Sequence, residues 1–189
     1  MLNLYKLIEI LVSLQLLIIS TLIPIYIPLP FTDNSSINFD IPITWQIPTI
    51  ILLTLLFNRK VVFRAFTIYI ILGLFILPVF NDGGSIGYLL TPNFGYLLGV
   101  YPLIKVIDNL NTRNKINVGN FLKNGFIAII AMHLTGIFYN FIQVIFFSQF
   151  NIFLYNLGKY SIGKIGYHYL MLFPILLLIK PIESIKRSK

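Results

Sequence analysis

The sequence predicts an all-α integral membrane protein, and three observations carry this prediction. Of the 189 residues, 57% are hydrophobic and only 11% are charged, and the mean hydropathy is +0.86. Water-soluble globular domains are about one-quarter charged, so this composition is not theirs. Apolar runs of about 20 residues, the length that crosses a bilayer as a helix, recur along the whole chain. We therefore expect one domain, residues 1–189, made of six transmembrane helices.

Prolines, glycines and short polar links divide the apolar sequence into these helices. Pro24, Pro28 and Pro30 end the first helix, and Pro42 and Pro48 open the second, because proline has no N–H to donate within a helix. The N-terminal run is too long for a signal peptide and lacks a small-residue cleavage site. The six helices are predicted at about Tyr5 to Ile27, Ile43 to Phe57, Val61 to Phe80, Pro92 to Leu110, Asn120 to Gln149 and Ile165 to Ile182.

The distribution of charge predicts the orientation in the membrane. Six helices place both termini on one side, and all but two of the 14 basic residues fall on that side; the exceptions are Lys159 and Lys164. By the positive-inside rule the N- and C-termini are cytoplasmic. The polar stretch 32–40, the glycine-rich segment and residues 150–164 then lie together on the outer face. Insertion topology thus explains the net charge of +8, and we expect the lipid bilayer rather than nucleic acid as partner.

Residues 73–100 break the pattern of simple helices. The segment starts as a membrane helix, breaks at Pro78, passes through a glycine-dense turn and becomes apolar again after Pro92. Irregular backbone at membrane depth persists only where protein or a water-filled cavity satisfies its polar groups. We therefore expect this segment to form the wall of a binding cavity. The glycines expected to shape it are Gly83, Gly84, Gly87 and Gly95.

Motifs for catalysis and for nucleotide binding are absent from the sequence. It has no Cys, no H-E-x-x-H or G-x-S-x-G motif, and no Gly-Lys-Ser or Gly-Lys-Thr after the glycines. It also has only two His and six acidic residues. We predict no enzyme activity, no metal and no cofactor. A membrane-embedded scaffold or enzyme stays the alternative, and the convergence of three outer segments argues against a scaffold.

Motifs in the first two-thirds of the chain are those of a known family. They are IPLP at 27–30, PITWQ at 42–46, and LPVF at 77–80 followed by Gly-Gly, Gly87 and a Gly-Tyr-Leu-x-Gly run. This pattern resembles the BioY family, whose members are the biotin-binding S components of energy-coupling-factor (ECF) vitamin transporters, over roughly residues 15–105. The resemblance implies an S-component-like bundle with irregular outer loops in the bacterial inner membrane. It also implies biotin as the ligand, and a transmembrane coupling subunit with two ATPase subunits as partners. ATP would be used only by those partners.

Two features of that family have altered counterparts here. The family opens its last helix with PGD-x-x-K, whereas SIGKIGYH at 161–168 places Lys164 at the position of the acid and Tyr167 at that of the base. An S component for another small vitamin is therefore the alternative to biotin. The family's first helix carries small residues that dock on the coupling subunit, and only Ser13 and Ser20 can take that part in this chain.

Biotin sets the chemistry that the cavity would need. Its ureido group requires donors and acceptors, its ring apolar or aromatic walls, and its carboxylate a cation or amide. Gln46 has two interpretations: it offers a donor and an acceptor to the ureido group, or it hydrogen-bonds to the backbone groups left free near Pro48. Lys164 also has two: it pairs with the carboxylate of the ligand, or it extends to the lipid headgroups. Tyr88 and Tyr96 line the ring or lie in the core. The predicted binding residues are Gln46, Asn81, Tyr88, Tyr96, Asn140, Lys164, Tyr167 and His168.

Polar residues in the fifth predicted helix have two interpretations. His133 lies near its middle, where it is functional or, more commonly for such a residue, a neutral His bonded between helices. Asn140 follows seven residues later, nearly two turns, on a similar face. We expect that face to line the cavity. His168, in the last helix, binds either the ligand or backbone.

Overall fold

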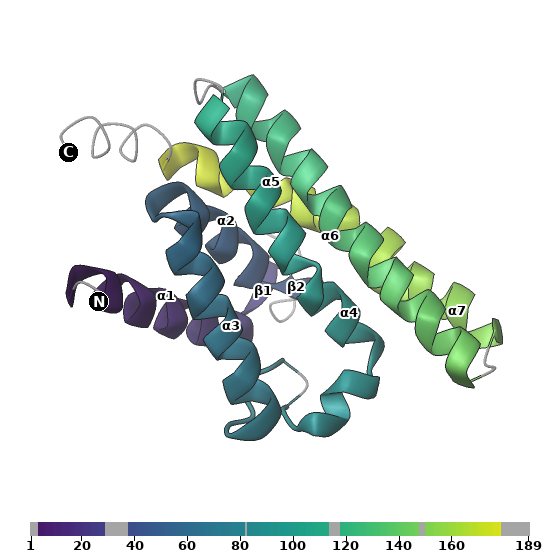
Figure 1. Cartoon of the computed structure of the whole chain (residues 1–189). Coiled ribbons are helices and arrows are strands. Elements are labelled where there is room, and N and C mark those ends of the chain that lie inside the picture. Colours follow the sequence, from purple (N-terminus) through teal and green to yellow (C-terminus); the bar gives the residue numbers. More distant parts are fainter. Residues whose placement is uncertain (1–3, 29–37, 82, 114–117, 148–149, 179–189) are drawn as a thin grey trace.

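The computed structural model describes residues 4–28, 38–81, 83–113, 118–147 and 150–178. In the N-terminal half, α1 (Leu4–Leu22) packs on α2 (Gln46–Leu56) and α3 (Arg59–Phe75). In the C-terminal half, α4 (Pro92–Leu98) and α5 (Val100–Arg113) pack along the long helix α6 (Val118–Phe147), while α2 and α3 meet α5. Figure 1 shows α6 and the last helical segments running side by side along one flank of the bundle.

The mostly helical fold agrees with the predicted class. Three of the described helical stretches are long and apolar enough to cross a membrane, namely Leu4–Leu22, Val118–Phe147 and Ile152–Leu178. The remaining helices in the described part of the chain are shorter or interrupted. Six spans therefore stay a prediction.

A β-hairpin departs from the all-α prediction. The first helix ends at Leu22 and not at Ile27, and β1 (Pro24–Pro28) pairs antiparallel with β2 (Asn38–Thr44). Proline is tolerated in a two-stranded sheet because both strands are edge strands. Pro24 and Pro28, two of the three prolines predicted to end the helix, thus begin and end a strand, while Pro30 lies outside the described residues. The second helix begins at Gln46 because β2 extends to Thr44.

The predicted fourth helix is two helices, α4 and α5, which meet at Gly99. A Cβ atom at this position would overlap the backbone carbonyl oxygen of Met132 in α6. The glycine therefore permits the backbones of α4–α5 and α6 to approach closely, and the break in the helix lies at that approach.

The last helix begins before the predicted Ile165. Residues 150–164, expected as a connecting segment, form α7 (Phe150–Leu157), a π-helical stretch η2 (Gly158–Ile162) and the start of α8 (Gly163–Leu170); helix then continues from 172 to 178. A π-helical stretch inserts extra backbone into a helical turn and is often found at functional sites. Here it carries Lys159 and Tyr160.

The backbone between α3 and α4 is irregular, as predicted. Phe80 and Gly83 close a tight turn through two backbone hydrogen bonds of 2.9 and 3.0 Å, and Gly83 has a φ of 99°, which glycine adopts without strain. A short 3₁₀ helix, η1 (Ile86–Leu90), follows. Neighbouring side chains donate to carbonyls of this segment: Tyr69 to Val79 at 3.2 Å, Tyr139 to Leu89, and Gln143 to Leu89 and Thr91 at 3.4 and 3.5 Å. The protein itself thus satisfies irregular backbone in an apolar bundle.

Candidate ligand-binding cavity

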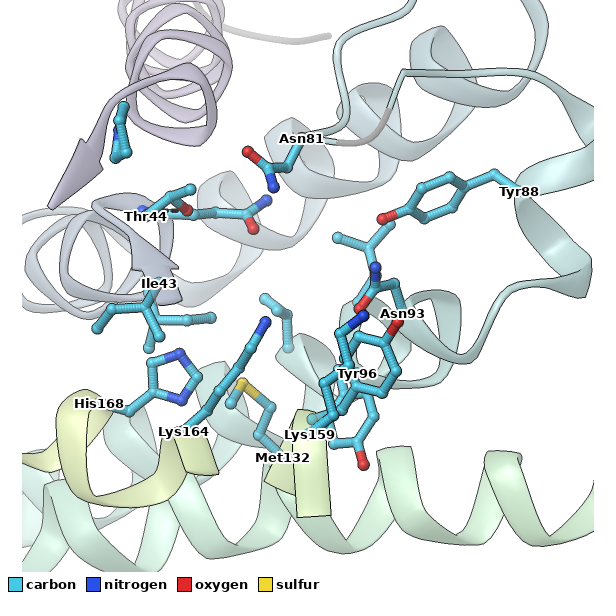
Figure 2. Close-up of a pocket in the computed structure, with 16 residues that line it drawn as sticks. Ile43, Thr44, Asn81, Tyr88, Asn93, Tyr96, Met132, Lys159, Lys164 and His168 are labelled. Carbon is cyan, nitrogen blue, oxygen red and sulfur yellow. Dashed lines mark hydrogen bonds between the residues drawn. The ribbon is translucent and has the colours of Figure 1, made fainter. Parts of the chain in front are cut away.

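A cavity of about 550 Å³ lies between the β-hairpin, the irregular segment, α4 and the η2–α8 stretch (Figure 2). The volume is in the range of pockets that hold small molecules. The hairpin contributes Ile43 and Thr44, and apolar side chains of α2, α4, α5 and α6 supply the rest of the apolar surface. Those side chains are Ile47, Leu97, Val100 and Met132.

Two lysines give the η2–α8 wall a positive charge. Lys159 and Lys164 both line the cavity, and their ammonium groups lie 5.2 and 5.4 Å from the centre of the Tyr160 ring. This geometry is that of a cation–π interaction. Figure 2 shows the Lys164 side chain extending from the wall into the cavity. No acidic side chain lines the cavity among the residues described, so this wall favours an anionic group.

Amide and phenol groups line the opposite wall. Asn81 and Tyr88 come from the irregular segment and Asn93 from the first turn of α4; in Figure 2 the Asn81 amide and the Tyr88 hydroxyl point into the cavity. Gln46, also in the lining, has a buried Nε2 atom that makes no hydrogen bond of regular geometry within the described chain, although its side chain interacts with the Tyr69 hydroxyl. A buried donor without a well-formed hydrogen bond is rare in proteins, and Gln46 Nε2 is therefore suited to donate to a ligand or water in the cavity.

A chain of buried polar side chains connects two points of the cavity surface. The Tyr96 hydroxyl lies 2.7 Å from Ser161 Oγ, which lies 3.3 Å from His133 Nδ1; His133 Nε2 lies 3.1 Å from His168 Nδ1. Tyr96 and His168 line the cavity, whereas His133 and Ser161 lie behind its surface and are only 1% exposed. His133 is bonded between α6 and α8, in agreement with one of the two interpretations of the sequence.

Six of the eight predicted binding residues line the cavity: Gln46, Asn81, Tyr88, Tyr96, Lys164 and His168. Asn140 and Tyr167 do not. Asn140 is buried in α6, where it accepts a hydrogen bond from Asn156 at 3.2 Å, and Tyr167 packs against Ile25 and Ile43 of the hairpin. The α6 face that was expected to line the cavity therefore lies behind it.

The predicted glycines shape the irregular segment and do not line the cavity. A Cβ atom on Gly84 would lie 2.5 Å from the Gly73 carbonyl oxygen, and one on Gly95 would overlap the Tyr139 side chain. Gly87 is less constrained, since its nearest such contact is Ser85 Oγ at 3.3 Å. Gly83 supplies the positive φ of the turn.

Sequence reasoning missed four polar or aromatic lining residues, namely Thr44, Asn93, Lys159 and Tyr160. Lys159 had a usable signal because it was the other basic residue expected on the outer face. Ser161 had none: a serine in an apolar helix gives no indication that it joins a tyrosine to a histidine.

The fold is shared with a solved structure, which indicates the class of protein. A crystal structure of the S-component for biotin from an ECF-type ABC transporter superposes with a TM-score of 0.61 and 20% sequence identity over 95% of each chain. At this identity the match shows the fold alone: the molecule has the fold of an ECF S component.

The sequence comparisons give the family. The chain is 41% identical over 75 residues to the probable biotin transporter BioY of Lysinibacillus sphaericus, a match that covers 40% of this chain and about a third (34%) of the relative. The sequence profile of the BioY family matches residues 1–173. The chain belongs to the BioY family.

Proposed function

We propose that this chain is the substrate-capture component of an ECF-type importer and that it binds biotin in the cavity described above. Family membership and the S-component fold support the class of transporter. The named relatives, a probable biotin transporter and an S component for biotin, support the ligand.

The chemistry of the cavity walls is the observation that carries the proposal. Amide side chains of Gln46 and Asn81 suit a ureido group, which needs both donors and acceptors. Tyr88 and Tyr96 offer aromatic surface to the fused rings. Lys164, on the opposite wall, suits the carboxylate through a charge-assisted hydrogen bond. The three parts of biotin thus have counterparts in one cavity of suitable volume.

The proposed topology follows from the segments that build the cavity. The hairpin, the irregular segment and the η2 stretch all contribute lining residues, and the distribution of basic residues supports an outer location for these segments. A cavity open to the exterior, with six spans and cytoplasmic termini in a bacterial inner membrane, is the arrangement expected of a subunit that captures solute from outside.

The proposed partners are a transmembrane coupling subunit and two ATPase subunits, which would release the ligand inward. The structure corrects one expectation about the coupling contact. Ser13 and Ser20 are buried, and their hydroxyls donate to the carbonyls of Glu9 and Leu17 in their own helix. Neither serine is available at the surface of α1, so another part of the molecule must carry that contact.

Equilibrium binding of labelled biotin to the purified chain in detergent tests the proposal. We expect saturable binding with about one site per chain, since six of the eight predicted binding residues line this one cavity. Unlabelled vitamins of similar size serve as competitors. Displacement by another vitamin but not by biotin would assign the alternative substrate, and no saturable binding of any of them would contradict the proposal.

A further inference from the structure

The hydrogen-bonded chain behind the cavity extends one step beyond Tyr96. Asn156 Nδ2 donates to Asn140 Oδ1, so the Asn140 amide is oriented with its acceptor toward Asn156. The Asn140 side chain also interacts with the Tyr96 hydroxyl. The geometry of this contact is irregular, because the buried Nδ2 atom of Asn140 makes no hydrogen bond of regular geometry within the described chain. Asn140 thus presents N–H groups, and not its oxygen, on the side that faces Tyr96.

This orientation gives the rest of the chain a single direction. A phenol has one proton; in the direction that Asn140 favours, Tyr96 accepts from Asn140 and donates that proton to Ser161 Oγ, which lies 2.7 Å away. Ser161 also has one proton and donates it to His133 Nδ1. The proton of the neutral His133 ring is then on Nε2, which donates to His168 Nδ1. A neutral imidazole has one donor and one acceptor, so His168 carries its proton on Nε2.

Both rings are neutral in this arrangement for a physical reason. His133 and His168 are 1% and 8% exposed, and the described chain places no carboxylate against them. Lys164 lies one helical turn before His168 and lines the same cavity. An imidazolium buried beside another cation would be strongly unfavourable.

His168 Nε2 is the ring nitrogen that the cavity can use. Nδ1 is occupied by His133, and Nε2 has no hydrogen bond to any described residue, while the side chain lines the cavity. The ring therefore offers a donor and not an acceptor. Lys164, one helical turn earlier on the same wall, offers a second donor to the same region.

We propose that His168 binds an acceptor oxygen of the ligand through Nε2–H, and that His133 and Ser161 are positioning residues which fix this tautomer without touching the ligand. The identity of the ligand rests on the proposed function, whereas the tautomer does not. The ligand oxygen is either the ureido carbonyl or the carboxylate, since both accept hydrogen bonds.

Nitrogen NMR of histidine tests the tautomer directly, because the chain has only two His. With ¹⁵N-histidine in the full-length protein at neutral pH, we expect both rings to carry the proton on Nε2. Ser161→Ala removes the donor to His133 Nδ1, so the proton should appear in part on Nδ1 of His133. Ser13→Ala is the matched control, a buried serine bonded only to its own helix, and should leave both spectra unchanged. A proton on Nδ1 of either ring in the unsubstituted protein would overturn the proposal.

Two substitutions of His168 test the contact with the ligand. The Gln amide nitrogen can take the place of Nε2, whereas the shorter Asn reaches only the place of Nδ1. We expect His168→Gln to retain most of the affinity for biotin and His168→Asn to lose about tenfold, the effect of one hydrogen bond. Equal affinities of the two variants would contradict a donor at Nε2.

Biotin and its carboxamide, compared on His168→Asn, distinguish the two oxygens. If the substitution lowers the affinity for both ligands equally, the oxygen that His168 contacts is the ureido carbonyl. If it lowers the affinity for the carboxamide less, that oxygen belongs to the carboxylate. If the unsubstituted protein does not bind biotin, the proposed function fails while the NMR result still decides the tautomer.

Discussion

The two halves of the molecule bury polar side chains in different ways. In the helices α1 to α3, most of them return to their own helix: Ser13 donates to Glu9, Ser20 to Leu17 and Thr54 to Ile50. Thr21 and Tyr69 are the exceptions: their hydroxyls meet each other, Thr21 also bonds to Leu17, and Tyr69 donates to the Val79 carbonyl outside its helix. From α4 to α8, buried polar side chains bond across elements, as Tyr96 does with Ser161 and His133 with His168.

This difference corresponds to the difference in role. A hydroxyl that bonds to the carbonyl three or four residues earlier satisfies itself and specifies nothing about neighbouring helices. A bond between elements fixes how those elements meet, and a satisfied buried network makes that arrangement specific. The half with such bonds is the half that supplies the cationic wall of the cavity. We conclude that the C-terminal half positions the cationic ligand-binding groups and that α1 to α3 pack mainly through apolar contacts, with Gln46 of α2 as their polar contribution to the cavity.

The largest effect is expected from reversing the charge on that wall. Lys164→Glu replaces an ammonium group in the cavity by a carboxylate, which repels an anionic ligand and loses its hydrogen bond. The affinity for biotin should fall by about 100-fold or more, within the range for losing a buried charged contact. Lys105→Glu, an exposed change in α5, is the control and should leave the affinity unchanged. Unchanged affinity of Lys164→Glu would remove this residue from the site.

The joint between the halves should be sensitive to added volume. A Cβ atom on Gly84 would lie 2.5 Å from the Gly73 carbonyl oxygen and 2.8 Å from Pro78 Cα, both of them backbone atoms. Gly84→Ala should therefore lower the free energy of unfolding in detergent by about 1–3 kcal/mol. Gly166→Ala makes the same change where nothing lies within 4 Å. Because alanine favours helix, it should raise stability by about 0.5–1 kcal/mol. Equal effects would show that the irregular segment adapts to the methyl group.

A pair of serines tests the comparison itself. Ser161→Ala and Ser13→Ala remove the same atom from equally buried positions, one bonded across elements and the other to its own helix. Loss of the Ser161 hydroxyl leaves buried partners unsatisfied, so we expect a loss of stability of about 1–3 kcal/mol. Ser13→Ala should change stability by less than about 0.5 kcal/mol. Chemical denaturation of both variants gives the difference, and equal losses would break the distinction between the halves.

The smallest effect is expected at the carbonyl groups of the irregular segment. Tyr139→Phe removes the donor to the Leu89 carbonyl, while Gln143 still donates to that oxygen at 3.4 Å. The loss should therefore be near 1 kcal/mol, the low end for a buried hydrogen bond. Tyr5→Phe, at a hydroxyl on an exposed side chain, should have no effect on the same denaturation curve. A larger loss at Tyr139 would mean that Gln143 does not compensate.

Much of the cavity could be predicted from the sequence because its strongest signals are local. Pro78, Gly83 and Gly84 disfavour the continuation of a helix, and Lys164 is one of two bases on the side where bases are rare. Irregular backbone and an exceptional charge therefore led to the irregular segment and to the η2–α8 wall. The structure places both at one cavity.

The remaining features depend on contacts between distant residues. The hairpin pairs Ile25 with Ile41, and the prolines and polar residues between the two strands are equally consistent with the end of a helix followed by a loop. The π-helical stretch at 158–162 continues a helix through a segment whose sequence predicts a linker. Asn140 was expected to line the cavity because of its helical spacing from His133, but the hydrogen bond from Asn156 holds it behind Tyr96. Helical periodicity predicts which residues share one face of a helix, but it does not predict which other residues cover that face.

The central claim is that the cavity beside Lys164 is the ligand site, and protection of lysines from an amine-reactive reagent tests it most directly. The purified protein is labelled with and without saturating biotin, and modification at each lysine is measured by mass spectrometry. We predict that biotin slows the modification of Lys164 and leaves that of the exposed Lys105 unchanged. Equal modification of Lys164 with and without bound biotin would contradict the account.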